Sequence, residues 1–541
     1  MSAHGTRIAG ALLTAAAVVA FRLPLFRLQA GFYDEGLIAL GAEQVLKGHW
    51  PLVDFYAPYP PGAFFAVAGF YELFGVGVLI ERAVSLGLVA VAAALAYLLV
   101  TGFETDCARP RARLVAAAIP LVTAAIYFGP TWVPPQVAGA FAFLFAAGLA
   151  LRAALRTGRL LGAAATGALL GVMALWRADL ALYGALAAGL VWLTRAPAPA
   201  TGGASFLAPS GEGRGGSAVR RRRLGFAAMA GAAGAVAFPV FALFIALGGR
   251  RAFEGLLVWP VLGTYHAMLP WPALFPRAEP PGVQAPLLTA RLSGWPFYFP
   301  VLAAALSLFR LWKRSDACQP ERDVELWLAL TACGMGVYAG GRSDVWHVRP
   351  LVFVSLVLVA SAARGLLARG RWYPLAVLLP ALVALGLPPL ETLITTPERR
   401  LPRAELPFAR GRGILLDPAT VQNYRLLIDE LRSLPPGEPI FSGTTRHDLF
   451  MVNDSLLYLL AERDPGTYYW CLDAGVTTRA AVQRQMIADL DAHGVHRVLR
   501  LSSFVVSDSS PSAEGSRLLD ERLQAAFVST KRIGPYELLS R

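Results

Sequence analysis

Long apolar runs recur along this 541-residue chain, and they constrain its fold more than any other feature. A run of roughly 20 apolar residues can cross the ~30 Å hydrocarbon core of a bilayer as a helix. Only 16% of the residues are charged, whereas soluble domains carry about 25%. The expected spans are residues 8–28, 82–102, 114–129, 136–155, 160–176, 179–194, 224–247, 296–312, 325–340, 350–368 and 373–392. The sequence therefore predicts a polytopic α-helical membrane protein with about 11 transmembrane helices.

Lysine and arginine gather in every second loop between these runs. Examples are the arginines at 109–113, 220–223 and 364–371, which follow the second, sixth and tenth runs. Basic loops of this kind face the cytoplasm, so the net charge of +13 reflects membrane orientation and not a nucleic-acid partner. We expect the first run to be a retained anchor and not a cleaved signal peptide. An odd number of spans then places the tail, residues 393–541, on the outer face.

Three segments outside the spans have distinctive compositions. Residues 195–223 are rich in Ala, Pro, Gly and Ser and end in four arginines, which predicts a flexible cytoplasmic linker near anionic lipid. The outer loop 249–295 is long and rich in Pro and Trp, a pattern typical of a functional loop at the membrane interface. Residues 58–76 are apolar but open with Pro-Tyr-Pro-Pro-Gly, so a re-entrant or interfacial helix is expected there.

The tail has the charge density of a soluble domain. Helical patterns at 421–434, 456–462 and 480–493 alternate with strand patterns at 439–442, 495–501 and 533–539. This alternation predicts a small α/β domain with a largely parallel sheet. Gly443-Thr444-Thr445 lacks the spacing and the lysine of a phosphate-binding loop, so we expect support or acceptor docking from the tail and not cofactor binding.

Two adjacent carboxylates, Asp34 and Glu35, directly follow the first apolar run. They could simply start a helix in a solvated loop, but acids at the mouth of a membrane-embedded protein are commonly functional. Other unusual polar residues fall on the same predicted side, namely Lys47, His49, Asp54, Tyr56 and Tyr59 in the first outer loop (29–81), Arg177 and Asp179 after the fifth run, and Arg342, Asp344, His347 and Arg349 after the ninth. Each could be a local ion pair or an interface residue, but their shared side favours one common site. Carboxylates for proton transfer and arginines for phosphate suit a donor containing a phosphate ester.

The first outer loop also resembles a known family. Phe32-Tyr33-Asp34-Glu35-Gly36, Gly48-His49-Trp50-Pro51-Leu52-Val53-Asp54-Phe55-Tyr56 and Pro58-Tyr59-Pro60-Pro61-Gly62 are similar to the first outer loop of GT-C membrane glycosyltransferases. The nearest branch is that of bacterial protein O-mannosyltransferases and lipid A aminoarabinose transferases. The resemblance extends to about residue 390 and includes the loop with Arg342, Asp344 and His347; the tail resembles the periplasmic domain of bacterial members.

This resemblance implies transfer of a sugar, with inversion, from a polyprenyl-phosphate donor to a glycan, lipid or protein acceptor. The protein would lie in the bacterial cytoplasmic (inner) membrane, with its site and tail on the periplasmic side. In the family the first-loop acid is the general base, a role that falls by position to Asp34, with Glu35 as its partner. Arg342, then Arg349 and Arg177, would stabilise the phosphate leaving group, and His347 would donate a proton or a hydrogen bond to it. The expected substrate-binding residues are Tyr33, Lys47, Tyr56, Tyr59, Asp179 and Asp344.

Metal use and two alternative functions stay open at this point. A divalent cation (Mg²⁺ or Mn²⁺) requires several oxygen ligands, and the sequence offers only Asp34 and Glu35 as candidate ligands, so no metal is assigned. The four cysteines are too scattered for a zinc site. A transporter or flippase for lipid-linked sugars would place charges near mid-span, whereas the charges here cluster at span ends. A non-catalytic scaffold that binds polyprenyl lipid is the third interpretation.

Overall fold

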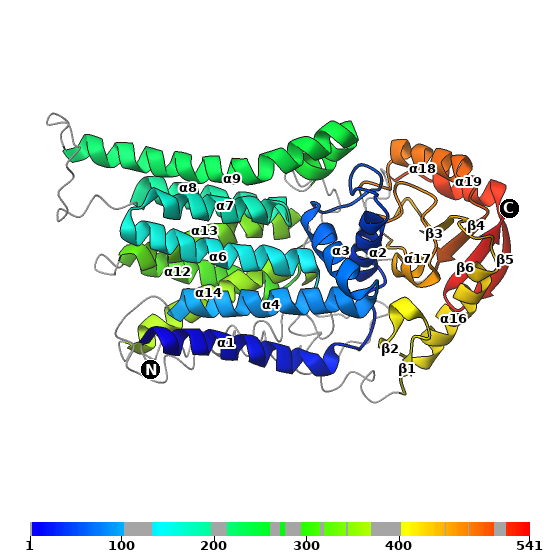
Figure 1. Cartoon of the computed structure of the whole chain (residues 1–541), viewed down its shortest axis with the longest axis horizontal. Coiled ribbons are helices and arrows are strands. Elements are labelled where there is room, and N and C mark those ends of the chain that lie inside the picture. The colour runs from blue at the N-terminus through cyan, green and yellow to red at the C-terminus, as the bar shows by residue number, and fades with distance from the viewer. Residues whose placement is uncertain are drawn as a thin grey trace.

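The computed structural model describes residues 3–101, 133–195, 214–259, 271–275, 294–313, 319–341, 345–368, 402–449, 451–473, 475–502 and 515–541. A bundle of long helices occupies one end of the molecule and an α/β tail the other, with the N-terminus at the bundle end farthest from the tail (Figure 1). Nine of the expected spans coincide with bundle helices. The other two, at 114–129 and 373–392, lie outside the described residues, as does most of the 195–223 linker.

The helices of the bundle are α1 (Ala3–Arg22), α4 (Val78–Thr101), α6 (Pro135–Thr157), α7 (Leu160–Ala174), α8 (Ala178–Arg195), α9 (Arg214–Phe253), α12 (Trp295–Lys313), α13 (Gln319–Gly341) and α14 (Val345–Ala368). Within the described part of the chain, four helical segments are long and apolar enough to cross a membrane by length and composition: Gly5–Leu25, Val78–Thr101, Pro135–Thr157 and Val219–Val258. Several shorter helices are also apolar. The chain is thus a multi-pass membrane protein, and the total of about 11 spans stays a prediction.

Small residues allow the bundle helices to approach closely. A Cβ atom added to Gly167 of α7 would lie 1.9 Å from the backbone oxygen of Met229 in α9. One added to Gly171 would lie 2.7 Å from the backbone oxygen of Ala233. Because lipid tails are as apolar as the side chains, such close backbone contact supplies much of the association energy inside a membrane.

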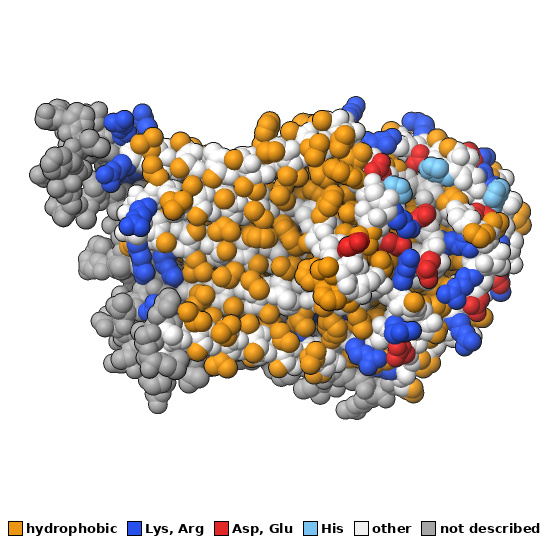
Figure 2. Space-filling view, viewed as in Figure 1, with side chains coloured by type: hydrophobic (Ala, Val, Ile, Leu, Met, Phe, Trp, Pro, Cys, Tyr) orange, Lys and Arg blue, Asp and Glu red, His pale blue; other side chains and the backbone are white. Residues whose placement is uncertain are grey.

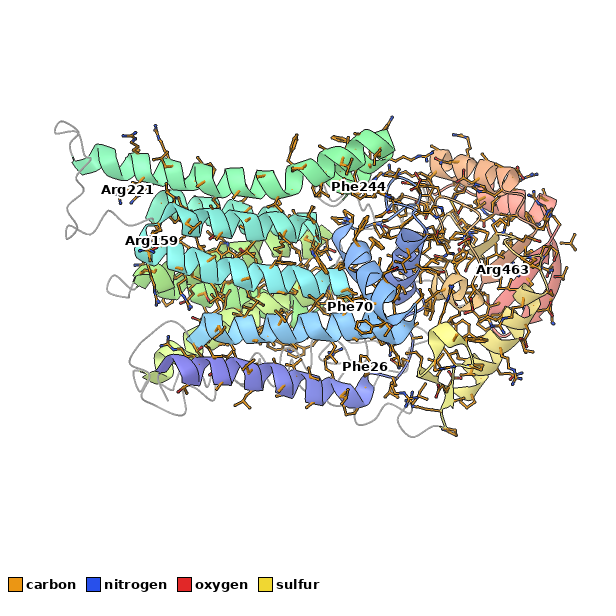
Figure 3. All side chains as sticks on the ribbon, in the orientation of Figure 1. Phe26, Phe70, Arg159, Arg221, Phe244 and Arg463 are labelled. Carbon is orange, nitrogen blue, oxygen red and sulfur yellow. The ribbon has the colours of Figure 1, made fainter. Side chains whose placement is uncertain are left out.

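Charge is distributed unequally between the two ends of the bundle. Lys and Arg side chains form a basic rim at the end farthest from the tail, followed by a broad apolar band, while the tail bears both signs of charge (Figure 2). Arg159 and Arg221 mark the rim, and Arg463 lies within the tail (Figure 3). Arg159 and Arg221, from two of the loops expected to be basic, therefore lie at the same end.

Two short helices of the first outer loop lie between the bundle and the tail (Figure 1). They are α2 (Asp34–Leu46) and α3 (Gly62–Phe74), with 13 residues each. At 1.5 Å per residue each is about 20 Å long, too short to cross the ~30 Å hydrocarbon layer. Helix α3 occupies the segment where an interfacial or re-entrant helix is expected.

The tail comprises β1 (Ala404–Glu405), β2 (Leu415–Leu416), α16 (Pro418–Arg432), β3 (Ile440–Thr444), α17 (Leu456–Ala461), α18 (Ala480–Ala492), β4 (Arg497–Leu501), α19 (Leu518–Ala526), β5 (Val528–Ile533) and β6 (Tyr536–Ser540). All six helices and strands expected in the tail are present within a few residues of their predicted bounds. Strands β1 and β2 form a small antiparallel pair, and the main sheet has the order β3-β4-β6-β5.

The prediction of a largely parallel sheet is wrong. Only β3 and β4 pair in parallel, whereas β6 is antiparallel to both β4 and β5. Helices α17 and α18 separate β3 from β4 and allow a crossover, but a tight turn at Gly534 (φ 53°) joins β5 to β6 and requires antiparallel pairing. Strand β5 was missed because five of its six residues are exposed and it has no apolar alternation.

A buried carboxylate makes the stability of the tail depend on pH. Asp454 accepts hydrogen bonds from the Tyr424 and Tyr536 hydroxyls at 2.8 and 2.7 Å. Burial raises its pKa to about 6, although these bonds oppose the shift. An unfolded aspartate titrates near about 3.9, so the folded tail binds the proton more tightly and its stability falls as pH rises from about 4 to about 6.

Asp454→Asn removes this titration while preserving the shape of the side chain. Between pH 4 and 6.5 we expect wild type to lose roughly 3 kcal/mol of stability relative to the variant, from about two units of pKa shift. Thermal unfolding of both purified proteins across this pH range measures the difference. A wild-type-minus-variant difference that stays constant with pH would contradict the assignment.

Candidate functional site

The predicted acidic pair opens helix α2, and its two members have different surroundings. Asp34 and Glu35 form the first turn of the helix, where carboxylates are favoured by the helix dipole. Successive helix residues point about 100° apart, so the side chains diverge. Asp34 is half-buried, whereas Glu35 is completely buried.

Glu35 is bound by Arg82 of α4. The guanidinium Nε and Nη2 donate to the two carboxylate oxygens at 2.5 and 2.9 Å, and the Gly31 backbone N–H adds a bond of 2.6 Å. Arg82 also donates to the backbone oxygens of Phe26, Leu28 and Gln29 at 2.7, 3.1 and 2.6 Å. All five N–H groups of this arginine are thereby used. The Glu35–Arg82 pair fixes the chain before α2 against α4. Arg82 was not among the residues predicted from the sequence.

Gly36, the last residue of the first-loop motif, allows the tail to dock on α2. The Leu456 N–H at the start of α17 donates to the Phe32 backbone oxygen at 2.9 Å. A Cβ atom on Gly36 would lie 2.2 Å from the Leu456 nitrogen. The close approach of the two helix starts therefore requires glycine here.

Gly36→Ala should loosen the tail, because the Leu456 backbone would have to move away. Overpacking of this kind costs typically 1–3 kcal/mol, which we expect as a lower unfolding temperature and faster proteolysis between the bundle and the tail. Gly69→Ala in α3 is the matched control, since a Cβ there meets nothing within 4 Å. If the two variants behave alike, close packing at Gly36 is not what holds the tail.

One loop of the tail, residues 468–473, lies against the first outer loop. Tyr33 Oη donates to the Leu472 backbone oxygen at 2.8 Å, and Tyr56 Oη donates to the Asp473 carboxylate at 2.9 Å. The ring centroids of Tyr56 and Tyr469 are 5.3 Å apart. Two tyrosines predicted to bind substrate thus contact the tail, which contributes a carboxylate, Asp473, that the sequence reasoning did not identify.

Burial and neighbouring negative charges disfavour ionisation of Tyr33 and Cys471. Desolvation raises the pKa of Tyr33 well above its usual value, and the nearby Cys471, Asp473 and Asp34 raise it further. Desolvation also raises the pKa of the Cys471 thiol, again with contributions from Asp473 and Asp34 and against its hydrogen bond with Tyr33. Asp34 and Asp473 therefore act on the same buried phenol and thiol.

Lys47 serves the docking of the tail. Its ammonium group lies 2.6 Å from Asp464 of the tail and 3.3 Å from Glu43 of its own helix. Glu43 also pairs with Arg410 at 2.8 Å. A role in substrate binding for Lys47 stays a prediction, because its ammonium group contacts two protein carboxylates.

A second group of predicted residues meets on the bundle side of the first outer loop. Arg177 donates from Nε and Nη2 to the two oxygens of Asp179 at 2.9 and 2.6 Å. Its guanidinium lies over the Tyr59 ring at 5.7 Å and over the Tyr338 ring at 5.3 Å. The His347 ring is 5.6 Å from that of Tyr338. Two of the predicted residues, Tyr59 and Asp179, thus contact Arg177. Arg177 and the predicted His347 both lie beside Tyr338, which was not predicted.

A backbone contact connects this group to the acidic loop. The Gly62 N–H donates to the Leu175 backbone oxygen at 2.8 Å, and a Cβ on Gly62 would lie 2.6 Å from that oxygen. This contact holds the Pro58–Gly62 motif of the first outer loop against the end of α7, and Tyr59 of the motif lies beside Arg177.

The remaining predicted phosphate ligands lie in or near the 342–349 loop. Arg342 and Asp344 are outside the described residues. Arg349, at the start of α14, and Arg82 of α4 are both close enough to Arg22 of α1 to repel its charge. Three arginines thus lie near one another at the tail end of the bundle. Among the described residues, no group of three or more His, Cys, Asp or Glu side chains could hold a metal ion.

Comparison with known proteins identifies the fold. No family model matches the chain, and no curated protein matches it. Among solved structures, ArnT from Cupriavidus metallidurans bound to undecaprenyl phosphate matches with a TM-score of 0.52 and 14% identity, over 100% of this chain and 98% of that chain. The apo form of the same ArnT matches with a TM-score of 0.51 and 13% identity over the same shares. This likeness covers the bundle and the tail together, so the chain has the GT-C-like membrane fold that the sequence led us to expect, the fold seen in ArnT.

Proposed function

We propose that this protein is an integral membrane glycosyltransferase that transfers a sugar from a polyprenyl-phosphate donor to a glycan, lipid or protein acceptor. The shared fold supports this, because the matching ArnT structure holds undecaprenyl phosphate. The basic rim at the end away from the tail supports placing that end in the cytoplasm. The site and the tail domain, residues 393–541, would then lie on the periplasmic face of a bacterial inner membrane.

Asp34 is the proposed general base, and the difference between the two adjacent acids is the observation that carries this assignment. Glu35 is completely buried and accepts hydrogen bonds from Arg82 and from the Gly31 N–H, whereas Asp34 is half-buried. In the reaction, Asp34 takes the proton of the acceptor hydroxyl as that oxygen bonds to the anomeric carbon. The bond from this carbon to the phosphate oxygen breaks, the polyprenyl phosphate leaves with the electron pair, and the sugar configuration inverts. Glu35 contributes by fixing the start of α2.

The arginines on the bundle side are proposed to bind the donor phosphate. Arg342 and Arg349 lead this assignment, with His347 as a hydrogen-bond donor, because a developing phosphate charge is stabilised by fixed cationic donors. Arg177 already gives Nε and Nη2 to Asp179. We therefore assign Arg177 and Asp179 to holding Tyr59 and Tyr338 in place for the donor sugar.

The test is transfer of radiolabelled sugar in membranes that contain the protein. A panel of polyprenyl-phosphate sugars is offered, with nucleotide sugars and membranes without the protein as controls. Label that moves to a new product only from a polyprenyl-phosphate donor supports the proposal. Movement of unchanged lipid-linked sugar across sealed vesicles would instead favour a transporter, and donor binding without either process would favour a scaffold.

A further inference from the structure

Gln136, in the first turn of α6, is a buried amide without a partner. Its side chain is completely buried, and neither Oε1 nor Nε2 has a hydrogen-bond partner. Within the described part of the chain, it is the one buried side chain that leaves two polar atoms unpaired. An amide that is removed from water and given no partner destabilises the fold. Its presence inside the bundle therefore requires a functional or a structural reason.

The chain that leads into α6 is rigid. The Ser85 hydroxyl of α4 donates to the Val133 backbone oxygen, which fixes this segment against α4. Pro134 and Pro135 follow, and the proline ring holds φ near about −65°. The main chain that carries Gln136 is consequently set in advance, as a preorganised binding residue requires.

Gln136 lies at the end of the bundle that adjoins the first outer loop and the tail. Helix α6 ends at Thr157, just before Arg159 of the basic rim, so the helix starts at the opposite end (Figure 3). The Cα–Cβ bond of a helical residue tilts toward the start of its helix. The Gln136 side chain therefore leans out of α6 toward the first outer loop and the tail.

The side of α6 that carries Gln136 packs against Trp176, the residue before Arg177. A Cβ atom on Gly139 would lie 2.3 Å from the Trp176 ring, and the ring centroids of Phe143 and Trp176 are 6.0 Å apart. Gln136, Gly139 and Phe143 have the spacing i, i+3 and i+7, so they share one side of the helix. Gln136 is thus about one helical turn, roughly 5 Å, from the position that Trp176 covers.

The first turn of α6 suits a hydroxyl better than a phosphate. Helix starts bind anions through their first N–H groups. Here Pro135 has no N–H, and the Val137 and Ala138 N–H groups both donate to the Pro134 backbone oxygen at 3.0 Å. The unesterified oxygens of a polyprenyl-phosphate sugar only accept hydrogen bonds, so a phosphate would leave Oε1 of Gln136 unpaired. A sugar hydroxyl both donates and accepts, and two neighbouring hydroxyls can pair with Oε1 and Nε2 together.

We propose that Gln136 binds hydroxyl groups of the donor sugar and thereby sets which sugar the protein accepts. The sugar supplies both hydrogen bonds that the amide lacks. It lies beside Tyr59 and Tyr338, which were assigned above to the same sugar and which both contact Arg177. This inference rests on the proposed function and adds a specificity-determining residue that the sequence reasoning did not identify.

Gln136→Met tests whether the amide is kept for binding or for structure. Methionine is similar in length and volume but needs no hydrogen bond. We expect the unfolding temperature of purified protein without donor to rise by about 1–3 °C, because the unpaired amide is gone. The further rise on adding a polyprenyl-phosphate sugar should be smaller than in wild type. A fall in the unfolding temperature without donor would refute the proposal, because it would show a structural role.

Gln483→Met is the matched control, because Gln483 is equally buried but fully paired. Its amide donates to the backbone oxygens of His447 and Ser516 at 3.1 and 2.7 Å, and its carbonyl accepts from the Leu519 N–H at 3.1 Å. Loss of these bonds should lower the unfolding temperature by a few degrees. A change of the same sign in both variants would refute the proposal.

Sugar discrimination is the second measurement. The donor that supports transfer is compared with its monodeoxy analogues, each lacking one hydroxyl. A site that binds a hydroxyl discriminates strongly against the analogue without it. For wild type we expect kcat/KM to fall by about 10–100-fold with at least one analogue. For Gln136→Met, the parent donor should lose about as much, and that analogue should react within about twofold of the parent.

The outcomes separate this inference from the proposed function. If wild type transfers sugar but Gln136→Met discriminates among the deoxy donors as wild type does, the role of Gln136 is refuted and the proposed function stands. An equal loss of kcat/KM with the parent donor and every analogue also refutes it, because a structural defect would act that way. If no donor is transferred by wild type or raises its unfolding temperature, both proposals fail.

Discussion

Asp34→Asn is expected to reduce transfer by about 10²–10⁴-fold in kcat, with the KM for the polyprenyl-phosphate donor nearly unchanged. Asparagine has the size of aspartate but cannot take the proton of the acceptor hydroxyl. The measurement is single-turnover transfer of labelled sugar by purified protein in detergent or nanodiscs. The size of the loss should shrink toward high pH, where hydroxide can substitute for the missing base.

Asp54→Asn provides the control for this change. Asp54 lies in the same outer loop, is exposed, and accepts a 2.6 Å hydrogen bond from the Trp50 N–H. It should reduce transfer by less than about twofold, since capping by asparagine is nearly as good. An Asp34→Asn protein that folds and transfers at the wild-type rate would exclude Asp34 as the base.

Arg82→Met is expected to have the largest effect on stability, about 3–5 kcal/mol, because it leaves the Glu35 charge buried without its partner. The variant also removes donors from the backbone oxygens of Phe26, Leu28 and Gln29. We expect a much lower unfolding temperature and poor accumulation in membranes. Thermal unfolding of purified protein, followed by the exposure of the buried Cys471 to a thiol reagent, measures this.

Two further variants separate charge from packing in this pair. Adding Glu35→Gln to Arg82→Met should recover part of the loss, because the unpaired charge is gone. Arg27→Met should cost about 1 kcal/mol or less, because Arg27 and Glu405 pair at 3.1 Å with both side chains about half exposed. Equal losses for Arg27→Met and Arg82→Met would show that burial of the Glu35–Arg82 pair has no special importance.

Some features of this protein follow from the sequence because their causes are local. The thickness of a bilayer sets the length of an apolar run, and this rule alone located nine helices of the bundle. The distribution of Lys and Arg along the chain predicted a basic rim at one end of the bundle, which the described residues show. In the tail, short-range apolar periodicity located six elements but not β5, whose exposed residues carry no such pattern.

Other features depend on contacts between distant segments. Adjacency in the sequence made Asp34 and Glu35 look like a pair, but Arg82, 47 residues away from Glu35, gives the two acids different surroundings. Asp473 reaches Tyr56 across 417 residues of chain, and the pairing of β6 with β4 made the sheet mostly antiparallel. Apolar run length and loop charge are properties of consecutive residues and could therefore be predicted. The partner of a buried charge, in contrast, depends on which distant segment the fold packs within about 3 Å of it. The sequence alone thus determined the membrane class and the candidate acids, and the tertiary structure decided that Glu35 pairs with Arg82 and that Asp473 of the tail contacts the first outer loop.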